Sequence, residues 1–405
     1  MKDGDDGIGQ KEGLPGGLLE SVDIPESATG VLTVDLAALL RNYRTLRGKA
    51  RSAECAAVVK ADGYGLGAGQ VARTLSAGGC RTFFVATLSE ADVVRAALPQ
   101  AVIYVLNGLF PGSALDFRRL GVRPVLGDMA EIEEWSAFCR AERILLPAAI
   151  HVDTGMNRLG LKADGRRRLL EKPEVLSSFC VSLLMSHLAC ADTPEHPKNA
   201  RQRDDFVAFA ARLPAAPLSL ANSAGIFLGS AFSFDLVRPG IGLYGGNPFS
   251  GLANPMEPVV TLHGRIAQIG EADAGETVGY GAGLTLTRRT RYATVAVGYA
   301  DGYFRALGSR DGQPGAIAFI DGQALPILGR VSMDLVVFDV TDLPQERAAR
   351  GGFVELVGPK FTVDDAAAQA GTMGYEILTS LGPRYHRIYL GAGDGAQSGR
   401  GIGHG

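Results

Sequence analysis

Between residues 56 and 246, short apolar runs rich in β-branched residues alternate with longer amphipathic stretches. This alternation is typical of parallel strands joined by crossover helices. Helices are predicted by stretches such as EIEEWSAFCRAER and QRDDFVAFAARL. Eight runs in strict alternation with helices favour a (β/α)8 barrel of the TIM type over an open sheet. In chain order the runs read AAVVKA, FFVATL, VIYVLNG, RPVLGD, PAAIHVDTGM, VSLLMSHLA, PLSLANSAG and DLVRPGIGLYG.

After Pro258 the pattern changes to short strands with Gly or Asp turns and few helical segments between them. This pattern predicts a second, mainly β domain with one helical region, DDAAAQAGT leading to GYEILTSL. A strand in ATGVLTVD precedes the barrel, and it could pair with either domain. The predicted strands lie in VVTLHGRIAQIG, YATVAVGYAD, AIAFIDGQALPILG, DLVVFDV and FVELVG.

The length of the chain allows two domains, because 405 residues with 46% apolar content can build two cores. We predict the barrel at 29–257 and the β-rich domain at 258–392. The segments 1–28 and 393–405 are Gly-rich and poor in apolar residues, so we expect them to be disordered tails.

Charge and cysteine content narrow the function. The 40 Lys and Arg nearly balance the 43 Asp and Glu, which gives no electrostatic reason to expect nucleic acid or an anionic membrane as a partner. The chain contains neither a secretory signal nor an apolar run of the roughly 18 residues that a membrane span needs. The five cysteines lack a C-x-x-C pair, as in reduced cytosolic proteins. We expect a cytoplasmic protein with a small-molecule ligand.

Polar side chains cluster where the predicted barrel strands end. In a (β/α)8 barrel this C-terminal face carries the active site. The sequence therefore predicts that these groups converge on one mouth. They are Lys60, Asp153, Arg158, His187, Asn222, Ser223 and Arg238.

Lys60 ends a buried strand in VVKADGYGLG. An isolated lysine there could be a rim residue that extends into water. It could instead form a Schiff base, its amine made nucleophilic by burial or nearby cations. Two Gly-containing segments on the same face could bind a phosphate, ANSAG at Ser223 and RPGIG at Gly240 and Ile241. Lysine and phosphate sites together favour pyridoxal phosphate as the cofactor.

Nine motifs in the chain resemble those of a known protein family: VVKADGYG, VDTGMNRLG, SHLACAD, NSAG, LVRPGI, VGYGA, GYADG, GRVSMD and GYEIL. In this order, from about Val31 to Leu390, the chain resembles bacterial alanine racemases. The resemblance implies an isomerase that interconverts L- and D-alanine with pyridoxal 5′-phosphate and supplies D-alanine for peptidoglycan. It also implies a homodimer in which each active site is shared between subunits.

The resemblance assigns roles residue by residue. Lys60 and Tyr280 are the two catalytic bases, lysine acting on the D-antipode and tyrosine on the L-antipode. Arg238 faces the pyridine nitrogen with His187 as its hydrogen-bonded neighbour, and both belong to the catalytic set. Arg158 lies near the phenolic oxygen of the cofactor and the substrate carboxylate. The phosphate is held by Tyr64, Ser223, Gly240, Ile241 and Tyr375. The partner subunit supplies Tyr280, Met333 beside the substrate, and Tyr299, Arg305 and Arg330 in the access channel, which Asp192 shares.

Two positions depart from the family pattern. His151 stands where many members have a lysine whose carbamate is thought to hold the arginine that corresponds to Arg158. Histidine cannot form that carbamate, so the orienting anion is absent, a chloride or another side chain, and the positioning of Arg158 is in question. Leu66 stands where the family often has histidine.

Other readings stay open at this point. Tyr280, Tyr299 and Tyr303 could be ordinary β-core tyrosines. The remaining histidines fit no metal-ligand spacing, and we expect no metal. The competing functions are a barrel-type amino-acid decarboxylase, a non-catalytic pyridoxal-phosphate carrier, and a racemase of broader or different specificity such as serine or lysine.

Overall fold

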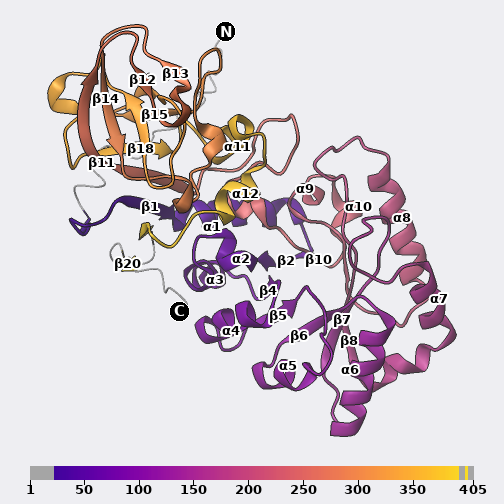
Figure 1. Ribbon diagram of the computed structural model, residues 1–405. Helices are drawn as coiled ribbons and strands as arrows, with labels where there is room; N and C mark the ends of the chain where they lie inside the picture. The colour runs from indigo at the N-terminus through magenta and orange to yellow at the C-terminus, as the bar shows by residue number, and fades with distance from the viewer. Residues whose placement is uncertain (1–21, 392–396, 400–405) are drawn as a thin grey trace, which may run out of the picture. The chain divides into compact units, whose positions relative to one another are not determined.

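The computed structural model describes residues 22–391 and 397–399. These residues form two compact units, whose elements Figure 1 labels. The barrel unit consists of Asp35–Val259 and Gly374–Ser380. The β unit consists of the other described residues, chiefly Val260–Met373. Most of the two predicted tails lies outside the described residues.

The strands of the barrel unit are parallel and follow one another in sequence order. Two sets of backbone hydrogen bonds join the last strand to its neighbours and so close the ring. On one side the N–H of Arg238 donates to the Ala221 carbonyl at 2.9 Å, and on the other the N–H of Ala56 donates to the Val237 carbonyl at 3.0 Å. The predicted (β/α)8 barrel is thereby confirmed. The first of its eight strands is interrupted at Ala56 into β2 (Glu54–Cys55), which pairs with β10, and β3 (Ala57–Val58), which pairs with β4. The other seven are β4 (Thr82–Val85), β5 (Val102–Val105), β6 (Arg123–Leu126), β7 (Pro147–His151), β8 (Cys180–Met185), β9 (Leu218–Ser219) and β10 (Leu236–Val237).

Helices surround these strands (Figure 1). The helix α6 shows how they pack: it turns an apolar face inward with Ile132, Trp135 and Cys139, all buried and spaced at helical intervals. Asp128 caps the start of α6 by accepting a hydrogen bond from the N–H of Ala130. The main helices are α1 (Leu36–Ala50), α2 (Lys60–Tyr64), α3 (Ala68–Ala77), α4 (Leu88–Ala97), α5 (Ala114–Leu120), α6 (Met129–Glu142), α7 (Ala163–Glu171), α8 (Lys198–Ala210), α9 (Ser223–Ile226) and α10 (Ser230–Ser233).

The β unit is organised around one long strand, β11 (Val260–Ala272). A register shift between Ile266 and Gln268 divides it. Its first half pairs with β1 and β18, and its second half pairs with β14. The other strands are β1 (Gly30–Asp35), β12 (Thr277–Val278), β13 (Leu284–Thr285), β14 (Thr290–Val295), β15 (Ile317–Ile320), β16 (Gln323–Pro326), β17 (Val336–Asp339), β18 (Phe353–Val357), β19 (His386–Leu390) and β20 (Gln397–Gly399). The mainly β nature predicted for this part of the chain is confirmed.

The structure answers the open question about the first strand. β1 pairs antiparallel with β11, Leu32 opposite Leu262, so it belongs to the β unit. Of the predicted late helical region, α11 (Val363–Ala370) lies in the β unit, whereas α12 (Gly374–Thr379) groups with the barrel. The chain therefore returns to the barrel unit near its end.

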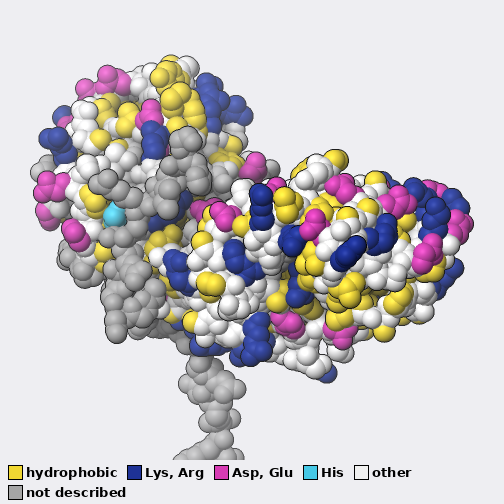
Figure 2. Space-filling view, turned by 90° about the horizontal axis from the view of Figure 1, so that it is seen from below, with side chains coloured by type: hydrophobic (Ala, Val, Ile, Leu, Met, Phe, Trp, Pro, Cys, Tyr) yellow, Lys and Arg dark blue, Asp and Glu magenta, His cyan; other side chains and the backbone are white. Residues whose placement is uncertain are grey.

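The surface carries charges of both signs. On the face drawn in Figure 2, Lys and Arg side chains are interspersed with Asp and Glu, in keeping with the formal net charge of −3. Within residues 22–391 no helix has both the length and the apolar character needed to cross a membrane.

Candidate active site

Lys60 follows β3 and opens an unusual turn. The next four residues, Ala61 to Tyr64, all have positive φ, between 52° and 63°. Three of them are not glycine, and a left-handed conformation costs roughly 1–2 kcal/mol for each such residue. The turn is held by hydrogen bonds from the N–H of Gly63 to the Val59 carbonyl at 2.9 Å and from Gly65 to Ala61 at 2.7 Å. Backbone geometry this costly persists only where surrounding contacts fix it.

The environment of Lys60 favours its neutral amine. Partial burial lowers the pKa of Lys60, and the nearby Arg158 guanidinium lowers it further, while the Glu90 carboxylate acts in the opposite direction. A lysine amine must be neutral to attack an aldehyde. The geometry and the electrostatics at Lys60 thus agree with a nucleophilic lysine.

Arg238 lies directly after β10 and is 4% exposed. One of its guanidinium nitrogens donates to the Ser219 hydroxyl, and another donates to the Ser186 carbonyl at 2.6 Å. Burial lowers the pKa of Arg238 to about 9, which leaves the group charged at neutral pH. A fixed positive charge therefore lies at the barrel mouth.

Two histidines complete this side of the mouth. Burial lowers the pKa of His151 to about 4, with Arg238 adding to the effect. Burial also lowers the pKa of His187 well below its usual value, followed by repulsion from Arg238 and Arg158. Both imidazoles are neutral at pH 7, so the positive charge of the cluster comes chiefly from Arg158 and Arg238.

Arg158 lies on the loop after β7, and Asp153 organises that loop. The Asp153 carboxylate accepts hydrogen bonds from the backbone N–H groups of Gly155 at 2.8 Å, Met156 at 2.8 Å and Asn157 at 3.0 Å. Asn157 has φ of 56°, so the loop turns sharply just before Arg158. Asp153 therefore places Arg158 through the backbone.

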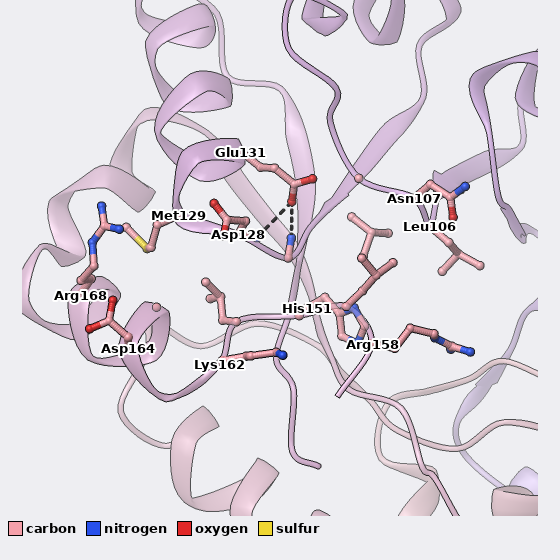
Figure 3. A pocket seen from close by; sticks show the side chains of 17 residues that line it. Leu106, Asn107, Asp128, Met129, Glu131, His151, Arg158, Lys162, Asp164 and Arg168 are labelled. Atoms are coloured by element: carbon pink, nitrogen blue, oxygen red, sulfur yellow. Dashed lines mark hydrogen bonds between the residues drawn. The ribbon is translucent and has the colours of Figure 1, made fainter. Parts of the chain in front are cut away.

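A cavity of about 380 Å³ adjoins this loop. Figure 3 shows the His151 and Arg158 side chains near each other on one side of it, with Glu131 on another. His151 is 8% exposed. His151 and Arg158 are the predicted site residues that line it, whereas Lys60, His187 and Arg238 do not.

The residues predicted to hold a phosphate come together around Ser223. The Ser223 hydroxyl accepts hydrogen bonds from the N–H groups of Gly240 at 2.8 Å and Gly242 at 3.2 Å. A Cβ on Gly240 would lie 2.2 Å from the Tyr64 hydroxyl, so only glycine leaves room there. Tyr375 lies close by, its ring centroid 6.1 Å from that of Tyr64. Ile241 begins the 3₁₀ turn η2 (Ile241–Tyr244) beside them.

This half of the candidate site suits an anionic aldehyde cofactor. It combines Lys60 and two arginines with the Ser223 hydroxyl and a glycine that admits no side chain. Phosphate and phenolate oxygens need such donors, and an aldehyde needs the lysine. The residues present therefore fit pyridoxal phosphate.

The remaining predicted site residues lie in the β unit, except Asp192, which is exposed on the loop after β8 of the barrel unit. Tyr280 opens the turn η3 (Tyr280–Ala282) and is 71% exposed. Arg330 lies against that turn, because a Cβ on Gly281 would be 3.2 Å from its guanidinium. Arg305 begins the short helix η5 (Arg305–Leu307). Gly308, which follows η5, packs against the backbone of Arg330.

Tyr299 and Met333 are neighbours in the same unit. The N–H of Ala300, next to Tyr299, donates to the Met333 carbonyl at 3.0 Å. Tyr299 is 42% exposed and Met333 54%, whereas Tyr303 is buried. The β-core reading is therefore right for Tyr303 and wrong for Tyr280 and Tyr299.

Two protein-family models together match most of the chain. The family model for the alanine racemase N-terminal domain matches residues 34–248, and the model for the alanine racemase C-terminal domain matches residues 259–389. The chain belongs to the alanine racemase family. Fold type III, the expected barrel followed by a β-rich domain, and dependence on pyridoxal phosphate come with this membership.

Individual alanine racemases are similar over nearly their whole length. The protein from Methylobacterium sp. (strain 4-46) is 52% identical over 359 residues, which is 89% of this chain and 97% of that protein. The protein from Rhodospirillum rubrum is 48% identical, over 92% of this chain and 98% of that protein. The crystal structure of alanine racemase from Bartonella henselae with covalently bound pyridoxal phosphate has a TM-score of 0.85 and 41% identity, and it covers 90% of this chain and 100% of that one.

The sequence did not point to every side chain around this racemase site. Glu90, Ser219 and Tyr244 were not predicted, although each contacts a predicted residue or its strand. The Thr87–Glu90 spacing is a helix-capping signature that marks Glu90, but it does not tell where the carboxylate reaches. Tyr244 donates to the Val58 carbonyl at 2.9 Å and stacks on Tyr64.

Proposed function

We propose that this enzyme interconverts L-alanine and D-alanine with Lys60 and Tyr280 as its two bases. The observation that supports the proposal most directly is Lys60 itself. It lies on a constrained turn at the barrel mouth, with its pKa lowered by burial and Arg158, among donors suited to an anionic aldehyde. The role is the supply of D-alanine for peptidoglycan in the cytoplasm. Some of the similar racemases are described as biosynthetic and others as catabolic.

When bound, pyridoxal phosphate withdraws electrons from the substrate and makes its α-proton acidic. The residues of this chain supply binding and orientation. Arg238 would hold a positive charge toward the ring nitrogen with His187 beside it, and Arg158 would bind the substrate carboxylate. Tyr64, Ser223, Gly240, Ile241 and Tyr375 would hold the phosphate.

Inversion at Cα requires that a proton leave one face and another arrive on the opposite face. Two fixed groups achieve this better than one that must swing across the substrate, because each is already in reach of its face. Lys60 Nζ serves one face and acts on the D-antipode. Tyr280 Oη serves the other and acts on the L-antipode.

We further propose that the active enzyme is a homodimer with shared sites. Tyr280, Tyr299 and Met333 are large apolar side chains on one unit, and each is more than two-fifths exposed. Exposed apolar groups favour an interaction surface where they lie together, as the Tyr299 and Met333 segments do. A second copy would cover them and receive Tyr280, Met333, Tyr299, Arg305 and Arg330 at the site of Lys60, with Asp192 contributing to the access channel.

The test of activity is a chiral chromatography time course with cofactor-loaded protein. L-alanine, L-serine, L-lysine and L-arginine are supplied separately, with Lys60→Ala and Tyr280→Phe as controls. We expect rapid D-alanine formation, slow reaction of the others, and no activity in either variant. Faster turnover of a larger amino acid would instead assign a racemase of broader specificity.

Mixing the two inactive variants tests the shared site. A heterodimer of Lys60→Ala and Tyr280→Phe would contain one intact site, built from the Lys60 of one subunit and the Tyr280 of the other. Random exchange of subunits should then restore about a quarter of wild-type activity. A mixture that stays inactive after proven subunit exchange would show that each subunit completes its own site.

A further inference from the structure

The first N–H of the turn after Lys60 is bound by a side chain from another element. Ala61 donates its backbone N–H to Glu90 Oε1 at 2.7 Å. Glu90 lies in the first turn of α4, which packs beside α2 and α3 (Figure 1). The residue that follows Lys60 is thus tied to the start of α4.

The second carboxylate oxygen of Glu90 fixes the base of α4. Oε2 accepts the N–H of Ala86 at 2.7 Å and that of Thr87 at 3.3 Å. In return, the N–H of Glu90 donates to the Thr87 hydroxyl at 3.3 Å. One carboxylate therefore caps a helix with one oxygen and holds the lysine turn with the other.

The barrel uses the same arrangement at the next but one helix. Glu131, in the equivalent position of α6, accepts the N–H groups of Gly127 at 2.6 Å and Leu109 at 3.1 Å. There the second contact reaches an ordinary loop. Of these two carboxylates, Glu90 is the one that joins its helix cap to a left-handed turn after a lysine.

We propose that Glu90 is a positioning residue, which fixes the backbone after Lys60 so that the lysine amine is presented at the barrel mouth. The inference rests on the proposed role of Lys60 as the cofactor lysine. Ala61 and Asp62 hold φ values of 52° without being glycine, so the turn relies on contacts of this kind. The Glu90 charge also faces the Lys60 amine.

A second capping box in this chain suggests a variant that separates the positioning role of Glu90 from its role as a helix cap. At α11, Thr362 and Asp365 form the same reciprocal pair, with the N–H of Thr362 donating to Asp365 at 2.8 Å. An aspartate can therefore close such a box. Glu90→Asp should keep α4 capped while its carboxylate is one methylene too short to reach Ala61. Thr87→Ala is the matched control, because it removes the cap hydroxyl and leaves the Glu90 carboxylate in place.

The experiment compares wild-type, Glu90→Asp and Thr87→Ala full-length proteins. We measure thermal unfolding without cofactor, capture of pyridoxal phosphate from its visible absorbance, and kcat and KM for alanine. Glu90→Asp should unfold near the wild-type temperature, yet capture the cofactor at least tenfold more slowly and lose kcat more than KM. Thr87→Ala should unfold at a lower temperature and capture the cofactor normally. Wild-type capture and kcat in Glu90→Asp, or an equal loss in Thr87→Ala, would overturn the inference.

Borohydride reduction followed by peptide mass spectrometry distinguishes this inference from the proposed function. Reduction should fix the cofactor on Lys60 in the wild-type protein. Fixation on another residue would refute the role of Lys60. Fixation on Lys60 at equal rates in wild type and Glu90→Asp would refute only the role of Glu90.

Discussion

The loop that carries Arg158 depends on a single carboxylate, and its removal should weaken substrate binding. Asp153 is 8% exposed and accepts backbone N–H groups from three consecutive residues, Gly155 to Asn157. Hydrogen bonds to a charged group contribute about 1.5–3 kcal/mol each. In Asp153→Ala the freed N–H groups of this loop can turn to water. We therefore expect the variant to lose about 2–4 kcal/mol of folding free energy, which is less than the sum over the three hydrogen bonds.

Most of that loss should be local. Asp153→Ala should leave the barrel folded but release the turn before Arg158, so KM for alanine should rise about tenfold or more with a smaller change in kcat. Asp153→Asn keeps an acceptor oxygen for Gly155 and Met156 but turns an amide N–H₂ toward the N–H of Asn157. Its effect should be intermediate, about 1–2 kcal/mol.

Initial rates over a range of L- and D-alanine concentrations measure the split between kcat and KM. Hydrogen exchange at 155–158 reports the loop directly, and we expect faster exchange in both variants. Asp116→Ala is the control, because Asp116 forms an exposed pair with Arg119 at 3.7 Å and should change neither quantity. Unchanged KM and unchanged exchange in Asp153→Ala would refute the reasoning.

Three further outcomes follow from the geometry. Gly240→Ala should place a Cβ 2.2 Å from the Tyr64 hydroxyl, so cofactor affinity in equilibrium dialysis should fall at least tenfold, with about 1–3 kcal/mol lost in urea unfolding. Gly48→Ala meets no atom within 4 Å in the interior of α1, and it should add about 0.5–1 kcal/mol in the same titration. The pKa of His151 is lowered to about 4 in the fold, so stability should be lost as pH falls from about 6.5 to 4, by up to roughly 3 kcal/mol. The difference in folding stability between pH 4.5 and pH 7.5 should be smaller in His151→Gln than in the wild type. An unchanged difference would mean that other groups cause the pH dependence.

The sequence was sufficient to predict the barrel and the residues at its mouth. Apolar runs of strand length alternate with helical stretches, and parallel strands bring their C-terminal ends to one face whatever the details of packing. Lys60, His187 and Arg238 each end such a run, so their convergence follows from topology alone.

What could not be predicted depends on contacts between segments distant in the chain. The left-handed backbone of Ala61 opposes the preference of that residue, and Glu90 in another helix stabilises it. The pairing of β1 with β11 is likewise a contact between distant segments, and local pattern did not choose between the two possible domains. Local pattern also did not show that α12 would group with the barrel.

The histidine at position 151 bears on how Arg158, the proposed substrate arginine, is held. Among the residues that the structure describes, no carboxylate forms an ion pair with Arg158, and His151 beside the cavity is neutral at pH 7 because burial lowers its pKa to about 4. A side-chain anion of the kind expected from the family pattern therefore does not come from His151. Asp153 instead constrains the backbone that leads to Arg158, because its carboxylate accepts three N–H groups of that backbone. A backbone turn fixes where the Arg158 side chain starts but not how its guanidinium rotates, so Asp153 can set the position of Arg158 without setting the direction in which its guanidinium points.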